Sequence, residues 1–197
     1  VQPRIEGALI VLLGLAAFLA PWEALHPVAA LLTLAGGVLV LWRIRGWQPM
    51  KCRDRPDLQM LMLGYAWLAI GLILLAYRWW APEHASTALH AFTVGALGTL
   101  ASGIMLRHVI LRAKRRPEQE PVLLPLAGLF AVAAVLRLWA VEAGSAGLTL
   151  LWLSAAAWSL GWLLVAWRLA AWIPRTQRDT GKLDPGQERG ELPRRHR

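Results

Sequence analysis

Histidine is the residue type with the greatest capacity for chemistry in this chain, and one histidine lies inside an apolar stretch. Residues 87–106 contain no ionisable side chain except His90. An ionisable residue within a membrane-spanning helix usually faces the interior of a helix bundle, and neutral imidazole is the commonest metal ligand in proteins. Three interpretations stay open for His90: a metal or heme ligand, a hydrogen bond to a neighbouring helix, or a proton relay.

Two more histidines are expected on the same side of the membrane as His90. His26 begins the second apolar segment, and His84 lies in the loop that precedes His90. Three glutamates belong to the same side, namely Glu23, Glu83 and Glu142. Imidazole suits copper, iron and zinc, and carboxylate can complete the ligand shell. We therefore predict a metal site formed by His90, His26 and His84; the competing interpretation is that the loop residues are scattered at the water interface.

Arg137 and Arg78 are predicted near the outer ends of two spans. Either side chain could extend to the interface and leave only its apolar stem in the membrane. Alternatively, a guanidinium could pair with a carboxylate, a heme propionate or an incoming anion. Arg137 is therefore a candidate cofactor-binding residue. His108, eighteen residues after His90, is interpreted as an interfacial residue because no other span carries a histidine near its inner end.

Small residues follow His90 at helical spacing: Ala91, Gly95, Gly98 and Ser102. Such a stripe lets a second helix approach closely, and it could also let a flat macrocycle approach the backbone. Helix packing is the favoured interpretation. In a regular α-helix, His90 would lie about 100° from this stripe, beside the contact face.

Other kinds of site are excluded by the sequence. Cys52 is the only cysteine, which rules out an intrachain disulfide and any cysteine-based zinc or iron–sulfur site. No nucleotide-binding loop, HExxH motif or nucleophile elbow is present.

The elements that must position these residues are predicted to be membrane-spanning helices. The chain is 57% hydrophobic, only 17% charged, and has a mean hydropathy of +0.45. A helix needs roughly 20 apolar residues to cross a bilayer, and six segments qualify: Ile5–Ala20, Pro27–Leu41, Leu58–Tyr77, Thr87–Leu106, Leu123–Trp139 and Gly147–Trp172. We therefore predict an all-α, polytopic integral membrane protein of about six helices in a lipid bilayer.

Charge sets the expected topology. Lysine and arginine occur in residues 44–57, in residues 107–121 and in the tail, but not in residues 21–26, 81–86 or 141–146. Basic loops stay in the cytoplasm, so both termini are predicted to be cytoplasmic. The net charge of +9 then reflects topology and does not indicate nucleic-acid binding. Residues 1–173 form the predicted membrane domain, and residues 174–197 a basic, disordered cytoplasmic tail. Because residue 1 is Val, we expect either a fragment or an alternative start codon.

Several motifs resemble those of one family. They are LWRIRGW at Leu41–Trp47, LGYAWLAIGLILL at Leu63–Leu75, ALHAFTVGALGTLASGIMLR at Ala88–Arg107 and VLRLWA at Val135–Ala140. In order and separation they resemble the C-terminal half of NnrS-family proteins, from about residue 41. The resemblance implies a bacterial inner-membrane protein that binds heme and copper and relieves nitric oxide stress. It also implies that His90 occupies the family's motif position.

The chain departs from the family pattern in two ways. Family members have about twice as many spans, which implies a missing N-terminal half or another membrane subunit as partner. Leu111–Arg115 reads LRAKR, with Arg112 where the family pattern implies a histidine. We therefore expect this chain to bind a metal or heme and not to act as an enzyme that turns over a substrate. The alternatives are a cytochrome-b-like electron-transfer subunit with His26 and His90 as axial ligands, and a cofactor-free transporter or partner subunit.

Overall fold

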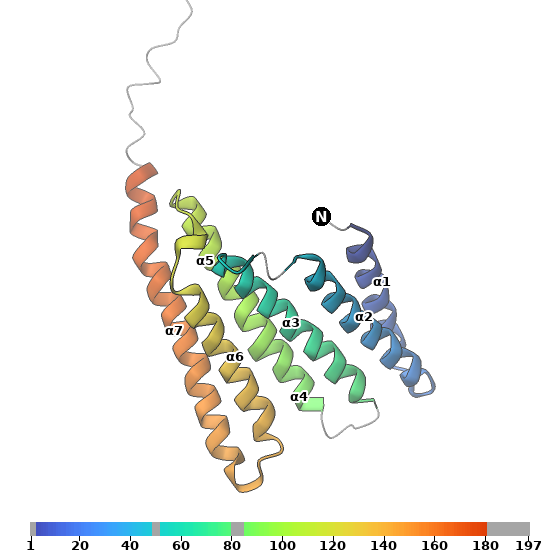
Figure 1. Cartoon of the computed structure of the whole chain (residues 1–197). Coiled ribbons are helices and arrows are strands. Elements are labelled where there is room, and N and C mark those ends of the chain that lie inside the picture. Colours follow the sequence, from blue (N-terminus) through green and yellow to red (C-terminus); the bar gives the residue numbers. More distant parts are fainter. Residues whose placement is uncertain (1–2, 49–51, 80–84, 181–197) are drawn as a thin grey trace, which may run out of the picture.

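The computed structural model describes residues 3–48, 52–79 and 85–180, and this part of the chain is a bundle of antiparallel helices without strands (Figure 1). The helices are α1 (Pro3–Leu19), α2 (His26–Gly46), α3 (Pro56–Tyr77), α4 (Ala85–His90) with η4 (Ala91–Leu97) and α5 (Gly98–Arg112), α6 (Leu123–Ala140) and α7 (Gly147–Thr180). Short 3₁₀ turns lie between helices at η1 (Glu23–Leu25), η5 (Pro117–Gln119) and η6 (Gly144–Ala146). The all-α prediction is confirmed.

Five helices in the described residues are long and apolar enough to cross a membrane. They cover Glu23–Gly46, Pro56–Tyr77, Thr87–Arg112, Leu123–Ala140 and Gly144–Ala171. α1 has 17 residues, which is the lower limit for a membrane-spanning helix. The sequence prediction of about six spans is therefore close, and α1 accounts for the difference.

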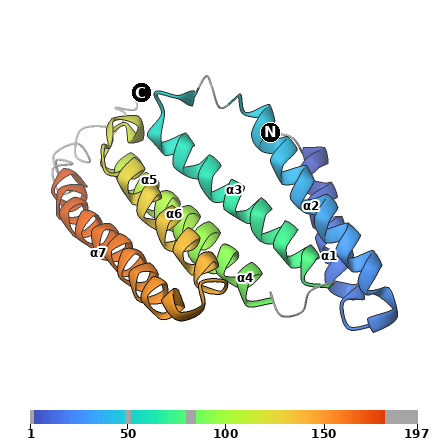
Figure 2. The same ribbon diagram turned by 60° about the horizontal axis from the view of Figure 1, so that its bottom comes forward.

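The bundle has two ends that differ in charge. The turn between α1 and α2, the start of α4 and the turn between α6 and α7 lie at one end, called here the His26 end (Figures 1 and 2). The start of α1, the start of α3 and the end of α7 lie at the other, called the Asp57 end. Within the described ranges, the basic segments that join α2 to α3 and α5 to α6 lie at the Asp57 end (Figures 1 and 2). The fold therefore gathers most of the positive charge of the described loops at one end, as the sequence predicted, and leaves Arg78 and Arg137 toward the other end.

The packing follows the order of the helices. α2 packs between α1 and α3, α3 packs against the α4–α5 segment, and α6 packs against α7. The largest buried cluster joins α3, α5, α6 and α7 through Met60, Leu106, Phe130 and Val165. Because apolar side chains gain little from leaving lipid, close contact between small residues must contribute much of the helix association.

The small-residue stripe is a packing face, as predicted, because Ala91, Gly95, Gly98 and Ser102 are all buried. Its glycines meet two different neighbours. A Cβ on Gly95 would lie 2.6 Å from the Trp67 ring on α3, and a Cβ on Gly98 would lie 2.8 Å from the Phe130 ring on α6. The helix that carries His90 is therefore held closely on two sides.

The helix after His90 differs from the sequence prediction in its winding. Ala91–Leu97 form a π-helix, with i→i+5 hydrogen bonds and a wider turn than the α-helix. The predicted angle of about 100° between His90 and the stripe assumed α geometry, so it does not hold here. The segment also begins at Ala85 and not at Thr87. At the other end of the chain, α7 continues to Thr180, so residues 174–180, assigned to the tail, are helical.

Candidate functional site

His90 is the last residue of α4, and its half-buried ring lies beside Arg137 on α6. Arg137 Nε donates a long hydrogen bond to His90 Nε2, at 3.4 Å. A guanidinium can only donate, so in this contact Nε2 is the acceptor of a neutral imidazole whose proton is on Nδ1. The lone pair that could bind a metal at Nε2 therefore faces Arg137.

The pair lies in a groove between η4 and α7. The groove has a volume of about 440 Å³ and is lined by His90, Thr93, Val94, Arg137, Ser154, Ala155, Trp158 and Ser159. Ser154 Oγ donates to the Ala133 carbonyl oxygen at 2.7 Å, and this bond ties α7 to α6. Thr93 Oγ1 donates to the Leu89 carbonyl oxygen at 2.8 Å. The groove thus combines one imidazole, one guanidinium, three hydroxyls and an indole, and its size is that of a small-molecule site.

Arg137 differs from most half-buried arginines of the bundle. Arg43 pairs with Glu6 at 2.8 Å, Arg107 pairs with Asp57 at 2.7 Å, and Arg55 and Arg168 also have carboxylate partners, Asp57 and Glu120. No ion pair to Arg137 is found in the described residues. Burial of a charge without an opposite charge is costly, which makes Arg137 the better candidate for binding an anion.

The Asp57 end holds a charged cluster that sequence reasoning missed. The Asp57 side chain is 1% exposed, and both Arg55 and Arg107 bond to its carboxylate. The hydrogen bond to Asp57 raises the pKa of Arg55 above its ordinary value, so this guanidinium stays charged. Arg55 Nε also lies 3.1 Å from Glu118 Oε2 on η5. The cluster therefore joins α3 to α5 and η5, and we assign it a structural role.

The other predicted site residues are placed away from the groove or lie outside the described part. His26 Nε2 contacts the Ala20 carbonyl oxygen at 3.2 Å, and its ring packs against Trp79 with centroids 4.2 Å apart. His26 does not line the groove. His84 and Glu83 lie outside the described residues. Among the described ranges, no group of three or more His, Cys, Asp or Glu residues is arranged to hold a metal.

The groove contains polar residues that sequence reasoning missed. Ser154 and Ser159 lie in α7, five residues apart within an apolar helix. Two serines and Trp158 in a span are too common to identify a site. Only the fold, which brings this part of α7 opposite η4, shows that they share a groove with His90.

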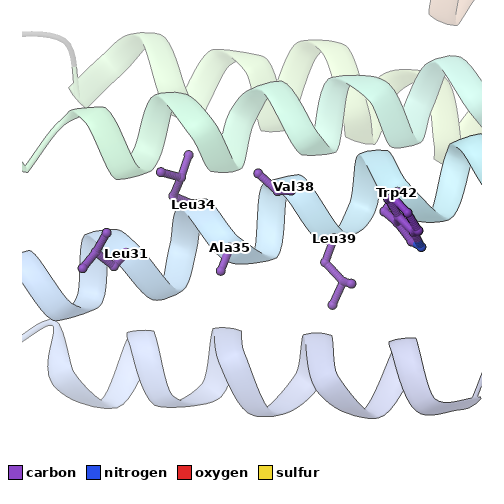
Figure 3. Close-up of a pocket in the computed structure, with 6 residues that line it drawn as sticks. All are labelled: Leu31, Leu34, Ala35, Val38, Leu39 and Trp42. Atoms are coloured by element: carbon purple, nitrogen blue, oxygen red, sulfur yellow. The ribbon is translucent and has the colours of Figure 1, made fainter.

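A second hollow follows α2 and has a different character. It has a volume of about 550 Å³ and is lined by Leu31, Leu34, Ala35, Val38, Leu39 and Trp42 (Figure 3). Apart from the Trp42 indole, these side chains have no polar atom. Lipid tails can fill such a surface, so the chemistry is assigned to the groove at His90.

The groove donors can be compared with what a heme or a copper ion needs. One histidine suffices as the axial ligand of a five-coordinate heme, and arginine can pair with a heme carboxylate. Copper sites use several imidazole, thiolate or carboxylate ligands, and His90 is the only such residue that lines the groove. The described residues therefore fit heme partly and do not form a copper site.

A family model described as NnrS protein matches residues 1–176. The match includes α1 and most of α2, which precede Leu41, where the first motif begins. No curated protein and no solved structure matches the chain.

Proposed function

Because this chain belongs to the NnrS family, we propose that it is a membrane protein of the bacterial nitric oxide response that binds heme in the groove between η4 and α7. His90 is the iron ligand in this proposal. Bound heme iron would supply a position at which a small gas molecule can coordinate. The protein residues supply the ligand nitrogen, an anion partner and a partly apolar enclosure.

One observation carries the proposal: His90, in the family motif, and Arg137, from a distant part of the chain, meet in one groove at 3.4 Å. An imidazole beside a guanidinium can serve the two different parts of heme, its iron and its carboxylates. For Nε2 to bind iron, Arg137 Nε must leave the lone pair that it now faces. The same movement would free the guanidinium for a carboxylate.

Copper binding is a separate proposal with less support in this chain. His90 would need further ligands, and the sequence offers His84, which lies outside the described residues, or a residue of another membrane subunit. His26 is less well placed, since it contacts Trp79 and Ala20. For the same reason the two-histidine cytochrome-b-like alternative is not favoured.

The proposed location is the bacterial inner membrane, with both termini in the cytoplasm and the His26 end facing outward. The basic residues of the Asp57 end motivate this orientation. The groove would then open in the outer half of the membrane. We propose binding and not turnover, because the groove has no pair of groups suited to acid–base chemistry other than His90 and Arg137, which stays protonated.

The test is reconstitution with heme. Wild type and His90→Ala are purified in matched amounts of folded protein, and bound heme is measured by absorption and by iron content. We expect stoichiometric heme in wild type and a loss of at least about tenfold in affinity in His90→Ala, because losing even a residue that supports a metal ligand typically costs about ten- to hundredfold. His108→Ala is the matched control, since His108 is exposed at the Asp57 end. Equal heme in wild type and His90→Ala would refute the assignment, and heme in neither would favour a cofactor-free subunit.

A further inference from the structure

The groove at His90 opens on the side of the bundle. Thr93, Ala155, Trp158 and Ser159 line it and are exposed. α7 packs against α6 and α5, whereas α4 and η4 pack mainly against α3 and α6. The two walls of the groove are therefore supported from behind and leave its opening uncovered in the described part of the chain. In a membrane this opening faces lipid.

The groove extends from near the level of the lipid headgroups to about the middle of the bilayer. Ser154 and Ser159 lie about 10 to 18 Å along α7 from its start at Gly147, at 1.5 Å per residue. Arg137 lies about one turn before the end of α6 at Ala140. An amphiphile in the bilayer presents its charged end at the level of Arg137 and its chain at the level of the two serines.

The chemistry of the lining matches such a molecule. Arg137 supplies a positive charge that has no ion pair among the described residues, and Thr93 and Ser159 add hydroxyls at the opening. Val94, Ala155 and Trp158 supply apolar surface beside them. A charged side chain at membrane depth is expected to have a partner, and His90, as a neutral acceptor at 3.4 Å, is a weak one.

We propose that this groove binds the anionic end, carboxylate or phosphate, of an amphiphile that enters sideways from the bilayer, with Arg137 as its counter-ion. The inference rests on the proposed function because both assign the same groove. It adds the class of ligand and the route of entry. It also gives Arg137 a role that does not depend on iron.

The experiment measures lipid association by electron paramagnetic resonance in phosphatidylcholine nanodiscs. The probes are spin-labelled stearic acid, its methyl ester and spin-labelled phosphatidylglycerol, at a pH where the acid is ionised. In wild type we expect the acid to associate about threefold more strongly than the ester, the ratio expected for one partly exposed ion pair. Arg137→Gln should remove this preference. A similar preference for phosphatidylglycerol that also depends on Arg137 would show that the groove binds the phosphate of a lipid headgroup. If phosphatidylglycerol shows no such preference, the groove binds a free carboxylate.

Two further variants separate the groove from general surface charge. Arg78 lies at the same end but contacts the Trp79 ring, 5.0 Å away, so Arg78→Gln should keep the preference. Arg137→Lys keeps the charge and should retain part of it. Equal association of acid and ester in wild type would overturn the inference, and this result does not depend on whether Arg137→Gln folds. Loss of the preference for the acid in Arg78→Gln would also overturn it.

The outcome is distinguishable from failure of the proposed function. His90→Ala should lose heme and keep the preference for the acid. If wild type binds no heme but prefers the acid through Arg137, the heme proposal fails alone. If wild type binds heme through His90 and shows no acid preference, the anion site fails alone.

Discussion

At the scale of single residues, the proposed chemistry depends on Nε2 of His90, the atom that Arg137 now contacts. A metal and a guanidinium cannot share that lone pair. In this contact the imidazole is neutral, with its proton on Nδ1, so Nε2 can bind a metal once Arg137 moves away. His26 has no comparable environment, because its Nε2 already lies against the Ala20 carbonyl oxygen.

Heme binding should depend on pH through the imidazole. Only neutral imidazole can bind a metal, and the ordinary pKa of histidine is about 6.5. We therefore expect heme occupancy to be complete near neutral pH and to fall as the pH drops below about 6. The measurement is a titration of heme absorption, with thermal unfolding followed in parallel so that loss of fold is not mistaken for loss of ligand. Constant occupancy in a protein that stays folded at low pH would mean that the ligand is not a histidine.

At the scale of helices, sequence reasoning was accurate where pattern alone decides the structure. Apolar length identified five spans and α1, and the stripe from Ala91 to Ser102 was identified as a packing face. It failed where winding decides the structure. Nothing in the composition of Ala91–Leu97 distinguishes a π-helix from an α-helix, because the two differ by a single step in hydrogen-bond pattern and share the same residue types. The groove was missed for a related reason, since residues of η4 and α7 come to line it together only in the folded chain.

The glycine contacts predict the effect of small substitutions. Gly95→Ala and Gly98→Ala would place a Cβ 2.6 Å from Trp67 and 2.8 Å from Phe130. Overpacking of this kind costs about 1–3 kcal/mol, so both variants should unfold at lower temperature in detergent. Gly128→Ala on α6 is the control, because nothing lies within 4 Å of its added Cβ. It should be neutral or slightly stabilising, since alanine favours a helix more than glycine does. Equal unfolding temperatures in all three would show that the helices are not closely packed at these positions.

The π-helix predicts which deletion the bundle tolerates. A turn closed by i→i+5 bonds holds one residue more than an α turn. Removing one residue can therefore convert it to an α-helix without changing the register of the flanking helices. Deletion of Leu97, which is exposed and outside the groove, should leave folded protein that still binds heme. Deletion of Ile104 in the α-helical part of α5 should rotate one part of the helix by about 100° relative to the other and disrupt packing. The yield of monodisperse protein in detergent compares the two, and equal damage would show that the π turn itself is required.

At the scale of the whole molecule, the fold places His90 and Arg137 toward the His26 end, and Arg137 has no ion pair among the described residues. The paired charges lie at the Asp57 end. Arg43, Arg55, Arg107 and Arg168 are neutralised by acids, and the basic loops add further positive charge there. A bilayer with its cytoplasmic side at the Asp57 end accommodates both the paired arginines and the basic loops. The groove then opens toward the outer leaflet, where the proposed amphiphile would enter.

This orientation can be tested with the single native cysteine. Cys52 lies between α2 and α3 at the Asp57 end and is partly exposed. The positive charge around it predicts a cytoplasmic position. A membrane-impermeant maleimide should therefore leave Cys52 unlabelled in intact spheroplasts and label it after the membrane is opened. Ser145→Cys in a Cys52→Ser background places the only thiol in the exposed turn η6. That thiol should react in intact spheroplasts. The opposite result is labelling of Cys52 before the membrane is opened, with protection of the cysteine at position 145. It would show that the orientation is reversed and that the His90 groove lies in the cytoplasmic half of the bilayer.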